Sequence, residues 1–97
     1  MRTLEEVRSI LRQHQHELHE RYGVKSLRIF GSYARGEQTP ESDLDLLARF
    51  TEGASLFDLV GLEDYLEAIL GCKVDILSER AIRPEIRENI LRDLVRL

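Results

Sequence analysis

Residues 31–47 read GSYARGEQTPESDLDLL and place two aspartates, Asp43 and Asp45, at the start of an apolar stretch. Positions that differ by two lie on the same face of a β-strand, so both carboxylates leave the same side of the chain. Two ionised carboxylates on one face repel each other and are costly to desolvate. A divalent metal ion that prefers hard oxygen ligands would offset this cost, and the pair therefore predicts a metal site.

Gly31 and Ser32 directly follow the stretch 24–30, whose apolar and polar residues alternate as in a strand. A glycine at the end of a strand lets the backbone approach a ligand closely, and a serine that leads into a helical turn adds a hydroxyl and free N–H groups. This pattern predicts an anion site suited to phosphates. Arg35 lies where it would touch a phosphate, and it is equally typical of a surface residue that closes a short turn.

A third aspartate, Asp75, lies in the stretch 73–77, which again alternates like a strand. If this strand lies beside the strand predicted over 43–50, Asp75 leaves the same face as Asp43 and Asp45. Three such carboxylates would hold two Mg²⁺ ions roughly 3.5–4 Å apart, the arrangement used for in-line phosphoryl transfer. A single acid on an edge strand is also commonly just solvated, so Asp75 keeps that second interpretation.

Helices are predicted around these strands. A Thr-x-x-Glu capping box opens a helix over 3–21, in which apolar residues recur every three or four positions. After the second strand, a helix capped by Ser55 ends before Gly71, and a last helix begins at Pro84. The stretch 36–42 is polar and contains glycine and proline, which indicates a loop.

The resulting order is helix, strand, strand, helix, strand, helix, without a repeat or a linker, and it predicts one domain over 1–97. A helix between the strands at 43–50 and 73–77 indicates that these strands run parallel through a right-handed crossover. The fold class predicted is therefore α+β (mixed α/β), with a mixed sheet of about three to four strands and helices packed against it.

Charge, hydropathy and cysteine content disfavour several classes of binding partner. A formal net charge of −4 argues against bulk electrostatic attraction to DNA or RNA, and 42% hydrophobic with 33% charged residues is typical of a soluble globular protein. No apolar run approaches the ~18 residues of a membrane span, so no membrane association is expected. The single cysteine, Cys72, has no partner for an internal disulfide, which favours the reducing cytoplasm.

Three histidines, His14, His16 and His19, raise the alternative of a zinc site. His16 and Glu20 lie one turn apart on the predicted helix, whereas His14 lies on its apolar stripe and points elsewhere. No cysteine or further ligand completes a tetrahedral set, so the pattern does not favour zinc.

Gly-Ser, ten intervening residues, Asp-x-Asp and a later strand aspartate together resemble the polymerase-beta-type nucleotidyltransferase superfamily. The residues of the stretch 31–47 and the short length of the chain resemble the minimal nucleotidyltransferases of this superfamily. These proteins are commonly the antitoxins of HEPN-domain ribonuclease toxins. The resemblance implies that Gly31 and Ser32 bind the phosphates of ATP and that Asp43 and Asp45 ligate both Mg²⁺ ions.

The same resemblance implies that Asp75 ligates one metal ion and helps to deprotonate the acceptor, and that Arg35 binds the nucleotide. The acceptor would be a tyrosine of the toxin, which receives AMP within a hetero-oligomeric complex. Arg87, Leu91 and Arg92 on the last helix are candidates for that interface. Two alternatives stay open: an antitoxin that only binds and occludes its toxin, and a nucleotidyltransferase that acts on a small-molecule hydroxyl.

Overall fold

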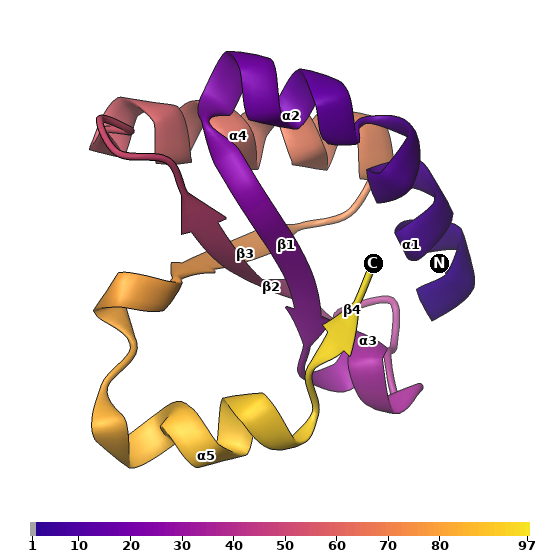
Figure 1. Ribbon diagram of the computed structural model, residues 1–97. Coiled ribbons are helices and arrows are strands. Elements are labelled where there is room, and N and C mark those ends of the chain that lie inside the picture. The colour runs from indigo at the N-terminus through magenta and orange to yellow at the C-terminus, as the bar shows by residue number, and fades with distance from the viewer. Residues whose placement is uncertain (1) are drawn as a thin grey trace.

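The computed structural model describes residues 2–97, which build a four-stranded mixed sheet with helices against it (Figure 1). The strands are β1 Val24–Phe30, β2 Leu44–Phe50, β3 Val74–Ser78 and β4 Val95–Arg96, in the order β3-β2-β1-β4. β1 is antiparallel to β2 and to β4, whereas β2 and β3 are parallel. The predicted fold class and the predicted parallel pair are both confirmed.

The helices cover the sheet unequally. They are α1 Leu4–Gln13, α2 Gln15–Tyr22, α3 Ser32–Arg35, α4 Leu56–Leu70 and α5 Pro84–Arg92, with a 3-10 segment η1 at Glu79–Ala81. Apolar residues of α1, α2 and α4 form the main core with the strands, and Figure 1 shows α5 on the opposite side of the sheet. None of the helices within residues 2–97 is both long enough and apolar enough to span a membrane.

The face of the sheet on the α5 side is only partly covered. Asp45, Leu47 and Arg49 alternate with the core residues of β2 and therefore leave the strand on this face. Leu47 and Ile90 of α5 are both buried but lie outside the main apolar cluster. Because little packs on the rest of this face, it is available for a ligand.

The helix predicted over 3–21 is wrong in one respect, because the structure divides it at His14 into α1 and α2. In a continuous helix the carbonyl of Ile10 would accept the backbone N–H of His14. Instead the His14 ring Nδ1 lies 2.8 Å from the Ile10 oxygen, and the His14 N–H donates to Leu11 at 3.2 Å. A side chain that replaces the backbone donor in this way is a recognised cause of a helix break.

Two further differences concern the strands. The strand predicted over 43–50 begins at Leu44, so Asp43 stands immediately before β2 rather than within it. Leu94 and Val95 were predicted to lie on the apolar face of the last helix, but α5 ends at Arg92 and Val95 belongs to β4. Two residues are too few to show the alternation of a strand. Its place beside β1 makes β4 an edge strand of the sheet, as Figure 1 shows.

The predicted capping box at the start of α1 is confirmed and leads to a test. The Thr3 hydroxyl accepts the Glu6 N–H at 3.2 Å, and the Glu6 carboxylate accepts the Thr3 N–H at the same distance. Thr3→Ala removes one side of this pair, so we expect the free energy of unfolding to fall by about 1 kcal/mol. Urea denaturation measures the change, and the exposed mid-helix Ser9→Ala variant, which should not be destabilised, is the control.

Candidate active site

Asp45 lies at the centre of the predicted carboxylate group. In the register of the sheet it stands opposite Asp75 of the parallel neighbour β3 and opposite Phe30 of the antiparallel neighbour β1. Asp45 is half-buried, whereas Asp43 and Asp75 are exposed. The structure therefore places the carboxylates of β2 and β3 side by side at the amino-terminal ends of these strands.

The three carboxylates interact electrostatically. Burial and, after it, the negative charges of Asp75 and Asp43 together raise the pKa of Asp45 from 3.8 to about 6, whereas the positive charge of Arg35 opposes this rise. A raised carboxylate pKa means that the ionised form is disfavoured in this environment. The repulsion that the sequence predicted is thus present, and a bound cation would relieve it.

Gly31 brings the backbone against the Asp45 carboxylate. Its φ of 75° and ψ of −152° lie in a region that essentially only glycine adopts. A Cβ built on Gly31 would overlap with Oδ2 of Asp45 and would lie only 3.1 Å from its Cγ. The absence of a side chain is therefore needed both for the turn and for the contact with the carboxylate.

The turn that follows is held in place from two sides. Ser32 opens α3, and Tyr33 anchors this short helix in the core with only 2% of its surface exposed. At the other end Nη1 of Arg35 donates to Asp93 Oδ2 at 2.9 Å, and Arg35 also lies 3.5 Å from Glu37. The predicted phosphate-binding residues thus lie on a fixed turn directly beside Asp45.

Sequence reasoning missed two acidic residues near this site. Asp93, just after α5, pairs with Arg35 from 58 positions away, and no local pattern links such distant residues. Glu63 of α4 has its pKa raised by burial and then by the negative charge of Asp75, so its carboxylate lies close to that end of β3. Glu63 was missed because it lies in a stretch whose apolar residues recur at helical spacing, and this spacing gives no sign of a role for the acidic residues between them.

The fit of a metal ion rests on the chemistry of these side chains. Within residues 2–97, no three His, Cys, Asp or Glu side chains are already gathered closely enough to hold a metal ion. Asp43, Asp45 and Asp75 nevertheless offer only hard oxygen donors, which suit Mg²⁺, and two of them are exposed and free to reorient. The raised pKa of Asp45 indicates that a nearby positive charge would stabilise its ionised form. The residues present therefore fit Mg²⁺.

Two of the three histidine rings contact backbone carbonyls. Nδ1 of His14 lies 2.8 Å from the Ile10 carbonyl, and Nδ1 of His19 lies 3.1 Å from the carbonyl of Val24. Each ring is thus engaged by the backbone near its own position in the chain, and nothing in these contacts favours the zinc alternative.

A cavity of about 710 Å³ opens beside Asp43, which is within the usual size of a small-molecule site. Asp43 is the one predicted site residue in its lining, and Tyr33 of α3, Cys72 and Lys73 also line it.

A mixed sheet with paired strand carboxylates and a glycine turn beside them is the arrangement that the resemblance to nucleotidyltransferases predicts. Residues 11–97 match the model of the nucleotidyltransferase domain family, and the chain belongs to this family. It is accordingly an enzyme of the nucleotidyltransferase type. The roles of the individual residues stay predictions.

Similar proteins agree with this assignment. The protein adenylyltransferase MntA of Thermococcus cleftensis is 46% identical over 95 residues, which cover 98% of this chain and 96% of that protein. A solved structure described provisionally as a minimal nucleotidyltransferase is 45% identical, with a TM-score of 0.83 and coverage of 99% of this chain and 97% of that one.

A more distant structure shares the fold. It is the Shewanella oneidensis complex of a tri-AMPylated HEPN toxin with its MNT antitoxin, which matches with a TM-score of 0.64 at 14% identity. The match covers 92% of this chain and 70% of that one.

Proposed function

We propose that this chain is the antitoxin of a toxin–antitoxin pair and transfers AMP from ATP to a tyrosine hydroxyl of a HEPN ribonuclease toxin. The observation that carries the proposal is the contact of the Gly31 turn with Asp45, which itself stands in register with Asp75. The adenylyltransferase name of the MntA relative supports AMP as the group and a protein as the acceptor. The shared fold with an antitoxin bound to an AMPylated HEPN toxin supports the partner.

ATP would bind with its phosphates on the α3 turn. Gly31 and Ser32 would offer backbone N–H groups and a hydroxyl, because the first N–H groups of a helical turn have no partner within the turn. Arg35 would add positive charge, although Asp93 and Glu37 already neutralise part of it. The cavity beside Asp43 would take the rest of the nucleotide.

Asp43, Asp45 and Asp75 would hold two Mg²⁺ ions. Bound there, Mg²⁺ supplies charge stabilisation at the reacting phosphate and lowers the pKa of the attacking hydroxyl. Asp75 is exposed and would accept the proton of the tyrosine hydroxyl. The tyrosine oxygen then bonds to the α-phosphorus, the bond to the β-phosphate bridging oxygen breaks, and pyrophosphate leaves.

The product would explain how the toxin is neutralised. Each transferred AMP adds bulk and a negatively charged phosphodiester, which repels the RNA backbone if it lies beside the ribonuclease site. The reaction requires a hetero-oligomeric complex, because the acceptor belongs to the partner, and it requires no direct contact with DNA. The free thiol of Cys72 is consistent with action in the cytoplasm.

The test is to incubate the chain with the HEPN protein encoded beside it, ATP and Mg²⁺, and to weigh the intact partner. We expect its mass to rise by whole AMP units on a tyrosine, and EDTA to prevent the rise. The variant with Asp43→Ala and Asp45→Ala should transfer no AMP and should not protect cells from the toxin.

Other outcomes would contradict the proposal in identifiable ways. An unmodified partner together with full protection by the double variant would support an antitoxin that acts by occlusion. Consumption of ATP at the same rate with and without the partner would instead support transfer to a small-molecule hydroxyl.

A further inference from the structure

A second cavity, of about 560 Å³, lies at the other end of β2 and β3 from the carboxylates. Residues of its wall come from the ends of these strands, from the loop before α4, from η1 and from α5. Its charged lining residues are Lys25, Arg49, Glu79, Arg80 and Arg87, and Leu56 contributes apolar surface. No part of the proposed mechanism uses this cavity.

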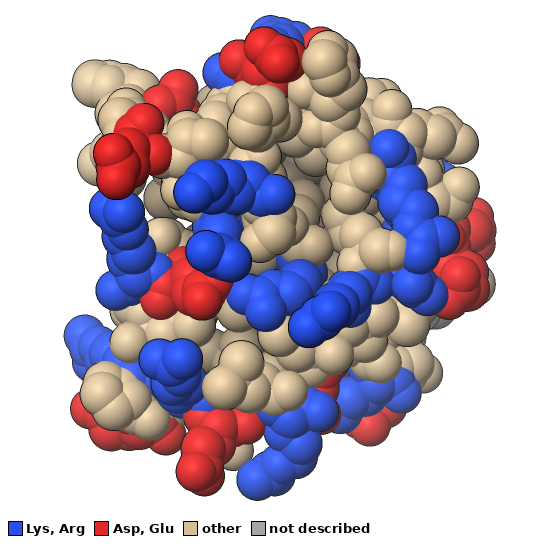
Figure 2. Space-filling model, in the orientation of Figure 1, with Lys and Arg blue, Asp and Glu red and all other residues tan. Residues whose placement is uncertain are grey.

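The cavity is positively charged although the chain as a whole carries a net charge of −4. Glu79 is its one acidic lining residue among residues 2–97, and two guanidinium groups already pair with it, Arg28 at 2.9 Å and Arg49 at 3.5 Å. Figure 2 shows lysine and arginine side chains gathered across this face of the molecule. The cavity therefore has an excess of positive charge, and this excess is local.

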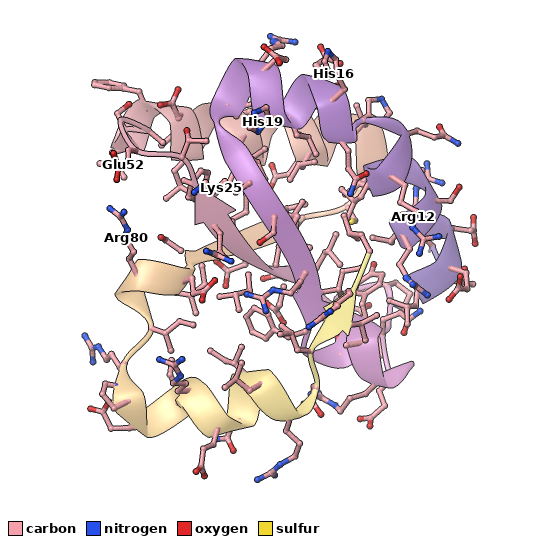
Figure 3. The ribbon with its side chains drawn as sticks, viewed as in Figure 1. Arg12, His16, His19, Lys25, Glu52 and Arg80 are labelled. Atoms are coloured by element: carbon pink, nitrogen blue, oxygen red, sulfur yellow. The ribbon has the colours of Figure 1, made fainter. Side chains whose placement is uncertain are left out.

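Lys25, Arg80 and Arg87 carry that excess. None of the three forms an ion pair with any residue of the described range 2–97. Figure 3 shows Lys25 and Arg80 projecting from β1 and η1 on the same side of the sheet. Cations that converge on a hollow without partners fit an anionic ligand.

One rim of the cavity is apolar and exposed. Leu56, Phe57 and Val60, at the start of α4, are 74%, 88% and 54% exposed, and Leu56 also lines the cavity. Large apolar side chains gathered at a surface mark sites of protein contact. The ligand that fits the charge of the hollow and the character of its rim is thus an acidic protein segment flanked by apolar residues.

Arg49 of the cavity and Asp45 leave β2 on the same face of the sheet, since they lie four positions apart along the strand. Four residues along a strand span about 13 Å. A protein whose tyrosine hydroxyl reached Asp45 and Asp75 would therefore cover this cavity as well.

We infer that this cavity binds an acidic segment of the same acceptor protein that receives the AMP. The inference rests on the proposed function, and it adds a second point at which the acceptor is recognised. RNA fits less well, because an exposed apolar rim does not match a phosphate backbone and the net charge of the chain is negative.

The inference is tested by reversing charge at the cavity in the full chain, with Arg80→Glu and Arg87→Glu combined. We expect the KM for the HEPN protein to rise about tenfold or more, with kcat little changed, since rim charges govern association more than chemistry. Arg83→Glu is the matched control, because Arg83 is exposed between these residues in sequence and does not line the cavity. It should leave KM unchanged.

Three results would overturn the inference. One is a double variant whose KM equals that of the Arg83→Glu control. Another is weaker binding of ATP by the double variant in the absence of the HEPN protein, which would make the cavity part of the nucleotide site. A third is binding of a 12-nucleotide oligouridine that the double variant loses, which would make the cavity an RNA site.

Failure of the proposed function is recognised separately. If the unmodified chain transfers no AMP, calorimetric titration of the HEPN protein into the chain without ATP still tests whether the cavity binds this protein. A loss of affinity of about tenfold in the double variant, absent in Arg83→Glu, would support the cavity as a docking site, and equal affinities would overturn it.

Discussion

Asp45→Asn is expected to abolish AMP transfer and, in the absence of metal, to make the protein more stable. The half-buried Asp45 carboxylate faces the negative charges of Asp75 and Asp43, which together with burial raise its pKa to about 6. An asparagine has nearly the same shape but no charge, so it removes the repulsion and the cost of desolvation. The variant also loses the central metal ligand, and we expect activity to fall at least about a hundredfold.

The gain in stability should depend on pH in a defined way. Below pH 3.8 the carboxyl is protonated in the folded and the unfolded protein, so wild type and variant should be equally stable. As pH rises from 3.8 to about 6, the unfolded chain ionises first, and the wild type loses stability. Above that range the difference should stay constant.

The size of the gain follows from the shift after an allowance for solvent. A rise of the Asp45 pKa from 3.8 to about 6 would correspond to roughly 3 kcal/mol for a fully buried group, but the half-exposed carboxylate is screened by solvent. We therefore expect about 1 kcal/mol at pH 8, which raises the melting temperature of a domain of this size by about 4–8 °C. Scanning calorimetry in EDTA measures it.

Two comparisons make the result specific. Glu88→Gln neutralises an exposed carboxylate on α5 and should leave the melting temperature nearly unchanged. Added Mg²⁺ should raise the melting temperature of the wild type more than that of Asp45→Asn, since a ligand stabilises only the state that binds it. Equal stability of wild type and Asp45→Asn at pH 8 without metal would show that the carboxylates do not repel one another as described.

The pairing of Asp45 with Asp75 could be predicted because it follows from two regular features. The alternation of a strand fixes which side chains share a face, and the helix between β2 and β3 fixes their parallel direction. The sequence also indicated the turn at Gly31 and Ser32, since glycine and serine have known preferences at such positions.

Contacts between distant segments could not be predicted in this way. The pair of Arg35 with Asp93 depends on how α5 returns to the sheet, and the approach of Glu63 to Asp75 depends on how α4 crosses β3. Neither depends on a local pattern. The break of the helix at His14 was not predicted for a related reason. The spacing of apolar residues identifies a helical face, but it does not show that a side chain replaces a backbone N–H as hydrogen-bond donor.

Gly31→Ala is expected to lower both stability and activity, and to do so far more than Gly36→Ala. Both glycines flank α3 with positive φ, 75° for Gly31 and 72° for Gly36. At Gly36 an added Cβ meets nothing within 4 Å, so the cost is that of the backbone conformation alone, about 1 kcal/mol. At Gly31 the backbone lies in a region closed to other residues and the Cβ overlaps with Asp45, so we expect about 2–4 kcal/mol.

Urea denaturation of the two variants measures the difference, and a double-mutant cycle with Asp45→Ala isolates its cause. Removing the carboxylate relieves the overlap, so Gly31→Ala should cost less in the Asp45→Ala background than in the wild type, by about 1 kcal/mol or more. The Gly36→Ala cost should be the same in both backgrounds. If Gly31→Ala costs equally much with and without the carboxylate, the turn does not press on Asp45, and the contact on which the proposed phosphate site depends is absent.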